Sequence, residues 1–386
     1  MMAYGGNKII NLILKKIYES PINGLEGVGN SNGFAFTYKV SDIPVAKLIS
    51  GVATHNIEIE LKVKISVNGN GVDFAKNVPM KAEGRIGVSN NILLITQLTL
   101  TNTSPNPIDN LIVSIINSQI IPPIRTTLRN IPLPRLNNLF GSGLSASIIS
   151  GSVIDNGPSF EVGLRITGSS GIANANRPTD TNLESLNTGG SNKVIAMVSD
   201  EAAQLLIKES FSELSQNFNK SVNGFGFGAK IKGKIQATKL KFDIASGVGR
   251  VKTTISINNL QGGIKAPLVG WQTIGIPCPD LIVEITNSIS VSGNRAIITL
   301  TGVDNINIDL NFPSLLSPVE SLLEGLFNTI LRAFHRKISD IIEGTKFEIF
   351  RLSGDLLGNN LNVNLGFEPG GLRYTGNSIQ AIIKVS

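Results

Sequence analysis

The sequence has one cysteine, two histidines and one tryptophan, and only 16% of its 386 residues are charged. A single cysteine, Cys278, excludes an internal disulfide and a zinc site built from several thiolates. The histidines, His55 and His335, have no neighbouring Cys, Asp or Ser residues from which a metal site or a catalytic triad could be assembled. We therefore expect a protein that is not an enzyme and that needs no cofactor and no metal.

Long hydrophobic runs are also missing, because no apolar stretch approaches the roughly 20 residues that span a bilayer. The N-terminus has lysines inside its apolar stretch and no small-residue cleavage site, so it is a poor signal peptide. These features predict a cytoplasmic protein or one exported without a leader. The asparagine-rich, cysteine-poor composition is typical of a bacterial chain.

Aromatic residues make up only 5% of the chain, whereas hydrophobic residues make up 41% and glycine occurs 40 times. The apolar side chains are thus mainly aliphatic, and this composition favours many short strands with tight turns. The length exceeds that of one ordinary domain. The net charge of +6 favours anionic partners, but no dense basic patch of the kind that binds nucleic acid is present.

Two segments that begin near residues 8 and 200 have the apolar spacing of amphipathic helices, and similar patterns follow each of them. Alternating, strand-like residues come next, at 55–69 and 227–244. A pair of strands then turns at Asn90-Asn91 in the first half and at Gly293-Asn294 in the second. A helix that starts near a proline follows, at 107–117 and at 318–343, and both halves finish in further strands.

This order indicates an internal duplication with a period of about half the chain. The polar segment 167–192 has no periodicity and is typical of a linker. We therefore predict two similar domains, residues 1–180 and 181–386.

The repeated order of helix, meander, long helix and strands resembles that of the tubular lipid-binding superfamily. Members of that family include bactericidal/permeability-increasing protein, lipopolysaccharide-binding protein and the clostridial P47 and OrfX proteins. The resemblance implies an α+β fold of two pseudo-symmetric tubular domains, each a highly curved antiparallel sheet wrapped around a long apolar helix. It also implies a non-enzymatic protein that holds a fatty acid or a phospholipid in an elongated hydrophobic groove.

Helix 318–343 is apolar over about half of its circumference and must be enclosed by a sheet, a partner or a lipid. Aliphatic side chains suit an alkyl chain because they leave no polar group without a partner. The predicted lipid-binding residues lie on the four helices: Ile9, Ile13, Leu14, Ile17, Leu111, Ile112, Ile115, Leu206, Ile207, Phe211, Leu322, Leu323, Leu326, Phe327, Ile330 and Phe334. The pattern leaves open whether the helix lines a groove or fills its own interior.

A ladder of lysines, which begins with Lys230, Lys232 and Lys234 and continues to Lys239 and Lys241, lies in the second half, where the first half has mixed charges. It predicts contact with an anionic membrane or a lipid headgroup, and a solvated sheet face is the alternative. Trp271 lies among glycines and prolines, and it fits either a membrane interface or the plug of one end of a barrel.

Two further functions are compatible with the sequence. A structural or toxin-accessory protein would use the same fold to bind a protein partner, and the resemblance to P47 and OrfX supports this alternative. A glycosidase would need two convergent carboxylates, and Asp304 and Asp309 are candidates that nothing in the sequence brings together.

Overall fold

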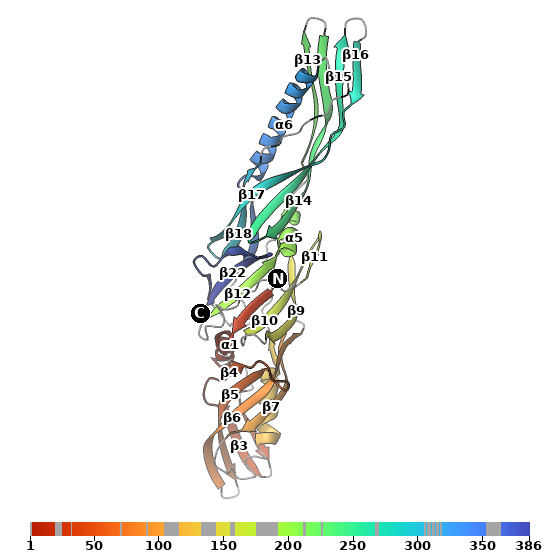
Figure 1. Ribbon diagram of the computed structural model, residues 1–386. Helices are drawn as coiled ribbons and strands as arrows, with labels where there is room; N and C mark the ends of the chain where they lie inside the picture. Colours follow the sequence, from red (N-terminus) through yellow and green to blue (C-terminus); the bar gives the residue numbers. More distant parts are fainter. Residues whose placement is uncertain are drawn as a thin grey trace. The chain divides into compact units, whose positions relative to one another are not determined.

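The structure is a computed structural model, and it is mostly β (Figure 1). It describes residues 2–19, 25–31, 33–69, 72–89, 92–103, 116–132, 144–154, 159–174, 192–210, 214–224, 227–266, 270–304, 306, 310, 313, 316, 319–352 and 364–386. Contacts divide the chain into two compact units. Unit 1 comprises Met1–Ser199, Phe350–Arg373 and Ile379–Ser386, and unit 2 comprises Asp200–Ile349 and Tyr374–Ser378.

Unit 1 contains a seven-stranded antiparallel sheet, the first curled sheet. Its strands are β2 (Glu26–Ser31), β3 (Phe34–Val40), β4 (Val45–Leu48), β5 (Ile57–Gly69), β6 (Val72–Ser89), β7 (Ile92–Asn102) and β8 (Asn130–Pro132). The alternation predicted for this region is confirmed, because every second residue of β5 from Ile57 to Ile65 is buried. Ser89 pairs with Ile92, so a two-residue connection joins β6 and β7 as predicted.

The helical segment of this sheet is η1 (Ile116–Ile120) followed by α3 (Ile121–Arg129), and α3 packs against β7 and β8. Ile120, Ile121 and Ile124 are buried in the core of the sheet. We predicted a helix over 107–117, of which only the last two residues are described. The described helical segment continues beyond residue 117 to Arg129 and includes Pro122 and Pro123 in α3.

An eight-stranded sheet contains strands from both halves of the sequence, and all of its residues belong to unit 1 except 374, 375 and 378. Its strands are β1 (Met2–Gly6), β9 (Ser145–Ile154), β10 (Ser159–Gly168), β11 (Gly171–Ala173), β12 (Lys193–Ser199), β20 (Leu365–Phe367), β21 (Arg373–Thr375) and β22 (Ser378–Val385). β1 and β12 pair antiparallel, β10 flanks β1, and β22 flanks β12. β1 leads into α1 (Asn7–Glu19) and β12 into α5 (Asp200–Ser210), so the two halves begin alike.

In both α1 and α5, a side-chain amide forms two hydrogen bonds with the backbone of a strand. In unit 1 the Asn11 amide donates to the carbonyl oxygen of Ala46 at 3.0 Å and accepts from its N–H at 2.6 Å. In unit 2 the Gln204 amide donates to Leu240 O at 2.8 Å and accepts from the N–H of Phe242. Each amide thus satisfies backbone groups that no neighbouring strand reaches at that point. The same kind of contact thus occurs at the fifth residue of both α1 and α5.

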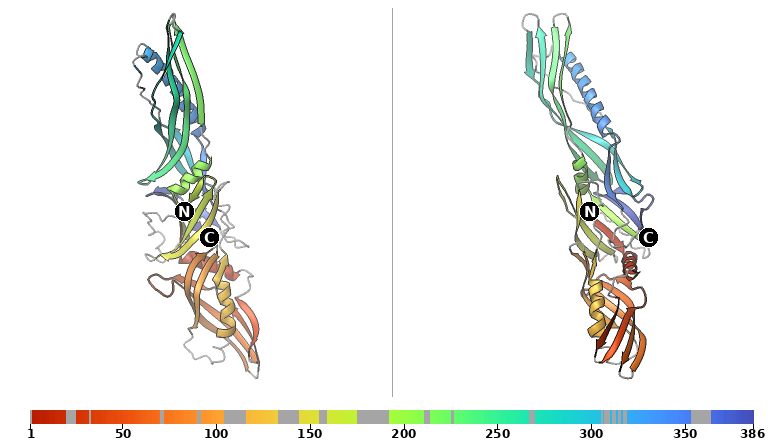
Figure 2. Two further views of the ribbon diagram at one scale, coloured as in Figure 1. Left: turned by 90° about the vertical axis from the view of Figure 1, so that its right-hand side faces the viewer. Right: turned by 180° about the vertical axis from the view of Figure 1, so that it is seen from behind.

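Unit 2 contains the second curled sheet. Its strands are β13 (Leu214–Gly224), β14 (Phe227–Ala245), β15 (Val248–Ala266), β16 (Gly270–Gly275), β17 (Leu281–Ser292), β18 (Arg295–Val303) and β19 (Lys346–Arg351). The helix α6 (Glu320–Ile342) runs along one face and contacts β13, β14 and β18 (Figure 2). β13 and β18 are four strand spacings apart, about 19 Å in a flat sheet, and a helix is only about 10 Å wide. The sheet must therefore curl around α6.

Parts of the predicted architecture need correction. α6, with 23 residues, is the only long helix in the described residues, and the described helices of unit 1 have at most 13 residues. The fold is therefore mostly β, without one long helix in each half of the described structure. The helix predicted over 200–218 was too long, because Leu214 and Phe218 lie in β13. That strand pairs with β14 along its whole length, and this pairing overrides the helical spacing.

Candidate functional site

The inner stripe of α6 is enclosed by the protein itself. Seven apolar side chains at helical spacing face inwards, and each is at most 6% exposed: Leu323, Phe327, Ile330, Leu331, Phe334, Ile338 and Ile342. Side chains with so little exposure contact protein atoms on nearly all sides. Of the predicted lipid-binding residues on α6, Leu326 is half-buried and Leu322 is 50% exposed, so these two are not part of the enclosed stripe.

The packing is close where α6 begins. A Cβ on Gly262 of β15 would lie 2.8 Å from Leu316 Cδ1, 2.9 Å from Ile276 Cδ1 and 3.4 Å from Leu323 Cδ1. Three aliphatic side chains therefore reach the backbone of the sheet at a position that has no side chain of its own. This end of the interior is filled.

A different apolar surface lies in unit 1, and we call it the α1 patch. Five half-buried side chains, Ile9, Leu12, Ile13, Val194 and Leu365, pack around the buried Val385. Three belong to α1, and the others come from β12, β20 and β22, which pair within the eight-stranded sheet. The patch is entirely aliphatic and is incompletely covered by the described residues, so it is a candidate site for an acyl chain.

The apolar residues of α1 are divided between two environments. Ile10 and Leu14 are buried in the core of the first curled sheet, whereas Ile9 and Leu12 pack in the α1 patch. Ile13 contacts both groups. Of the residues predicted here, Ile9 and Ile13 thus remain partly accessible, Leu14 does not, and the side chain of Ile17 lies outside the described structure.

The remaining predicted lipid-binding residues do not join the patch. Leu206 and Ile207 of α5 are buried in unit 2, and Phe211, Leu111, Ile112 and Ile115 lie outside the described residues. Sequence reasoning missed Leu12, which follows Ile9 at helical spacing and could have been found. It also missed Val194, Leu365 and Val385. These residues meet only through the pairing of strands almost 200 residues apart, which local sequence patterns do not indicate.

The predicted headgroup residues lie on the outer face of the second curled sheet. Lys230, Lys232 and Lys234 alternate with the buried Ile231 and Ile235, and all three lysines are half-buried. Trp271 of β16 is 37% exposed, and the Lys230 ammonium lies 5.9 Å from the centre of its ring. The structure therefore brings Lys230 and Trp271 together, which the sequence did not indicate.

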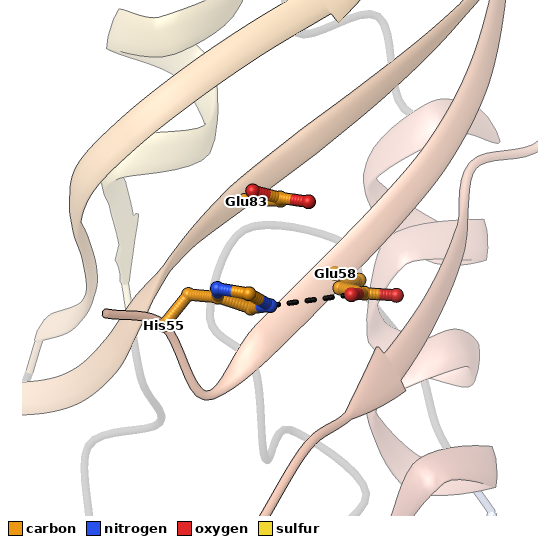
Figure 3. Close-up of side chains that lie close together, drawn as sticks. All are labelled: His55, Glu58 and Glu83. Carbon is orange, nitrogen blue, oxygen red and sulfur yellow. Dashed lines mark hydrogen bonds and ion pairs between the residues drawn. The ribbon is translucent and has the colours of Figure 1, made fainter. Parts of the chain in front are cut away.

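A cluster of His55, Glu58 and Glu83 on the first curled sheet has ligand atoms close enough to share a metal ion (Figure 3). Lys81 already provides a cation there, with Nζ 2.9 Å from Glu58 Oε1 and 2.9 Å from Glu83 Oε1. His55 Nε2 lies 3.2 Å from the same Glu58 oxygen. Because the one ammonium pairs with both carboxylates, the cluster is a structural ion-pair network.

The network predicts a pH dependence of stability. The hydrogen bond from Lys81, with a smaller one from His55, lowers the pKa of Glu58 below its ordinary value of 4.5 despite partial burial. Because the pKa of Glu58 is lower in the folded chain than in the unfolded chain, the ionised carboxylate stabilises the fold at pH values above the unfolded pKa. This stabilisation is lost as the pH falls through the folded pKa. We expect Glu58→Gln to cost about 1 kcal/mol at pH 7 and clearly less at a pH well below 4.5, measured by urea unfolding. Equal losses at both pH values would contradict this account.

A surface hollow of about 530 Å³ opens over β2, β3 and β5. It is lined partly by Lys39, Lys64 and Glu26, and Lys39 pairs with Glu26 at 2.9 Å. These charged walls do not suit an alkyl chain.

Asp309 lies outside the described residues, so the carboxylate pair that a glycosidase needs is not defined. No described helix has the length and apolar character needed to cross a membrane.

Two solved structures are similar to this chain over nearly its whole length. In the comparison with a solved structure of lipopolysaccharide binding protein, the match covers 100% of this chain and 98% of the chain in that structure, with 12% identity and a TM-score of 0.34. The structure of P47 from Clostridium botulinum A2 matches 99% of this chain and 96% of its own, with 8% identity and a TM-score of 0.44. No family model and no curated protein matches the sequence. The likeness concerns the path of the chain, and function is argued below from this chain's own residues.

Proposed function

We propose that this protein is a non-enzymatic lipid-binding protein that holds a fatty acyl chain, as a fatty acid or as part of a phospholipid, on the α1 patch. The observation that carries the proposal is the group of half-buried aliphatic side chains around Val385. An acyl chain laid on them would lose contact with water at no cost in unpaired polar groups. Each methylene buried contributes about 0.8 kcal/mol.

The α1 patch fits this role better than the interior of unit 2. The inner stripe of α6 would have to separate from the sheet before a ligand could reach it. The patch needs no such rearrangement, because Ile9, Leu12 and Ile13 already have part of their surface uncovered by described residues. We further propose that residues 1–180 and 181–386 are duplicated halves, of which the first supplies the helix that binds lipid.

Two measurements test the proposal. Organic extraction of the purified full chain, followed by mass spectrometry, should yield fatty acid or phospholipid in a stoichiometric amount. Titration of the delipidated chain with a fluorescent fatty acid should give saturable binding that the double variant Ile9→Asn, Leu12→Asn weakens at least tenfold. Ile282→Asn is the matched control, because Ile282 is 72% exposed on the second curled sheet and should have no effect.

The outcomes separate the possibilities. A lipid-free protein that binds no fatty-acid probe would refute the proposal. Binding that both variants leave unchanged would refute the α1 patch as its location. Thermal unfolding of each variant shows whether it has kept its fold, so a loss of binding by an unfolded protein is not misread.

The filled interior of unit 2 favours a second candidate function for that unit, a structural role in protein–protein contact. A tube whose helix is enclosed by its own sheet needs no ligand to complete it. The full chain is immobilised and the proteins that it retains are collected. Light scattering of the full chain, alone and mixed with these proteins, would show a defined complex if this function is correct. A chain that stays monomeric and retains nothing would argue against it.

A further inference from the structure

One end of the second curled sheet has charges of only one sign. The strand segments 214–224, 227–235, 253–266 and 270–275 contain five lysines and no aspartate or glutamate: Lys220, Lys230, Lys232, Lys234 and Lys265. These segments belong to four neighbouring strands, β13 to β16. We call the outer side of this region the basic face.

The register of the strands places the basic face on one side of the sheet. Lys265 of β15 pairs with Trp271 of β16 and with Gly228 of β14. Lys230, Lys232 and Lys234 follow Gly228 at every second residue, so they point to the same side. None of these four lysines forms an ion pair with the residues that the structure describes.

Trp271 lies flat across this face. A Cβ on Gly228 would be 3.1 Å from Trp271 Cη2, so the indole reaches over β15 to a position of β14 that has no side chain. A Cβ on Gly263 would be 3.7 Å from Cε3 of the same ring. One face of the ring thus packs on the backbone at two glycines, and the Lys230 ammonium lies 5.9 Å from the ring centre. Trp271 is 37% exposed.

The first curled sheet provides the internal comparison. Two of its outer lysines pair with acids, with Lys39 2.9 Å from Glu26 on the neighbouring strand and Lys62 3.0 Å from Asp42 in the connection between β3 and β4. An outer sheet face that contacts only water is typically of mixed charge, with lysines and acids interspersed as in the first curled sheet. The absence of aspartate and glutamate from the four described strand segments around Trp271 therefore points to an anionic partner.

We propose that the basic face docks on the surface of an anionic lipid bilayer. Lysines near such a surface are attracted by its negative potential, and their alkyl stems can lie along apolar surface while the ammonium groups reach the lipid phosphates. An indole that is apolar on its faces and carries one N–H donor suits the interface between headgroups and acyl chains. This docking does not depend on acyl binding at the α1 patch, and either activity can be present without the other.

The single tryptophan makes the contact directly observable. Full-length protein is mixed with vesicles of phosphatidylcholine containing 30% phosphatidylglycerol, and the emission maximum of Trp271 should move to shorter wavelength as the indole leaves water. Vesicles of phosphatidylcholine alone should cause no shift. Binding measured by flotation should weaken steeply at 0.5 M salt, because exposed charges are screened.

Variants locate the contact. Lys230→Gln, Lys232→Gln, Lys234→Gln together should lower the partition coefficient roughly a hundredfold, at about fivefold for each lysine. The control Lys39→Gln, Lys62→Gln, Lys64→Gln removes the same net charge from the outer face of the first curled sheet and should change it less than threefold. Both triple variants alter side chains at the surface, and their thermal unfolding is compared with that of the native chain.

Three results would overturn the proposal. One is an unchanged emission maximum with anionic vesicles, whether or not the protein floats with them. Another is equal binding to neutral vesicles. The third is binding of a soluble polyanion such as heparin without any binding to the anionic vesicles, which would assign the basic face to a different partner.

Discussion

Replacement of Phe327 by alanine should lower the free energy of unfolding of unit 2 by about 3–5 kcal/mol. Phe327 lies in the middle of the inner stripe of α6 and is 1% exposed. Removing its ring takes away the contacts of one large apolar side chain and leaves a cavity that the curled sheet can close only in part. Urea or thermal unfolding followed by circular dichroism measures the loss.

Leu322→Ala is the matched control on the same helix. Leu322 is 50% exposed, so its truncation should change the stability by no more than about 0.5 kcal/mol. The comparison also bears on function, because a tube that holds lipid next to Phe327 would tolerate the loss of the ring. A cost below about 1 kcal/mol for Phe327→Ala would show that the interior is loosely packed and would reopen α6 as a lipid site.

Replacement of Gly249 by alanine should destabilise unit 2 by about 1–3 kcal/mol. A Cβ on this glycine of β15 would lie 2.3 Å from Cζ of Tyr374 and 2.5 Å from its Cε1. The ring cannot move away freely, because its hydroxyl donates to Asn287 Oδ1 and the Asn287 amide in turn donates to Gly249 O at 2.9 Å. Burial raises the pKa of the Tyr374 hydroxyl, which remains a donor across the working pH range.

Two further variants identify the cause of that loss. A Cβ on Gly275 meets no atom within 4 Å, so Gly275→Ala should be nearly neutral. In a Tyr374→Ala background the added methyl group of Gly249→Ala has no ring to meet, and its cost should fall close to zero. If the two changes are instead additive, the contact between Gly249 and Tyr374 does not limit the stability of unit 2.

Patterns that depend on neighbouring residues were readable from the sequence. The alternation in 57–65 predicted a strand with one buried face, and α6 was predicted within two residues of its observed ends. The hairpin at Gly293-Asn294 has Ser292 paired with Arg295 and Gly293 at a positive φ of 60°, as a two-residue turn requires. Each of these features is set by local backbone preferences and by side-chain period.

Features that depend on long-range pairing were not readable. Nothing local to 214–224 shows that this segment pairs with β14, so its helical spacing was misleading. The α1 patch needs Leu365 and Val385 to meet a helix more than 340 residues earlier, which follows from the topology of the eight-stranded sheet alone. The contact of Trp271 with Lys230 likewise depends on the register of β14, β15 and β16.

The most direct test of acyl binding at the α1 patch is photocrosslinking with a fatty acid that carries a diazirine on its chain. The full-length, delipidated protein is loaded, irradiated and digested, and the labelled peptides are identified by mass spectrometry. We predict that the label is concentrated in residues 7–19 and 365–385, and that excess unlabelled fatty acid removes it. Label concentrated in residues 320–342, or label that the competitor does not reduce, would contradict the account.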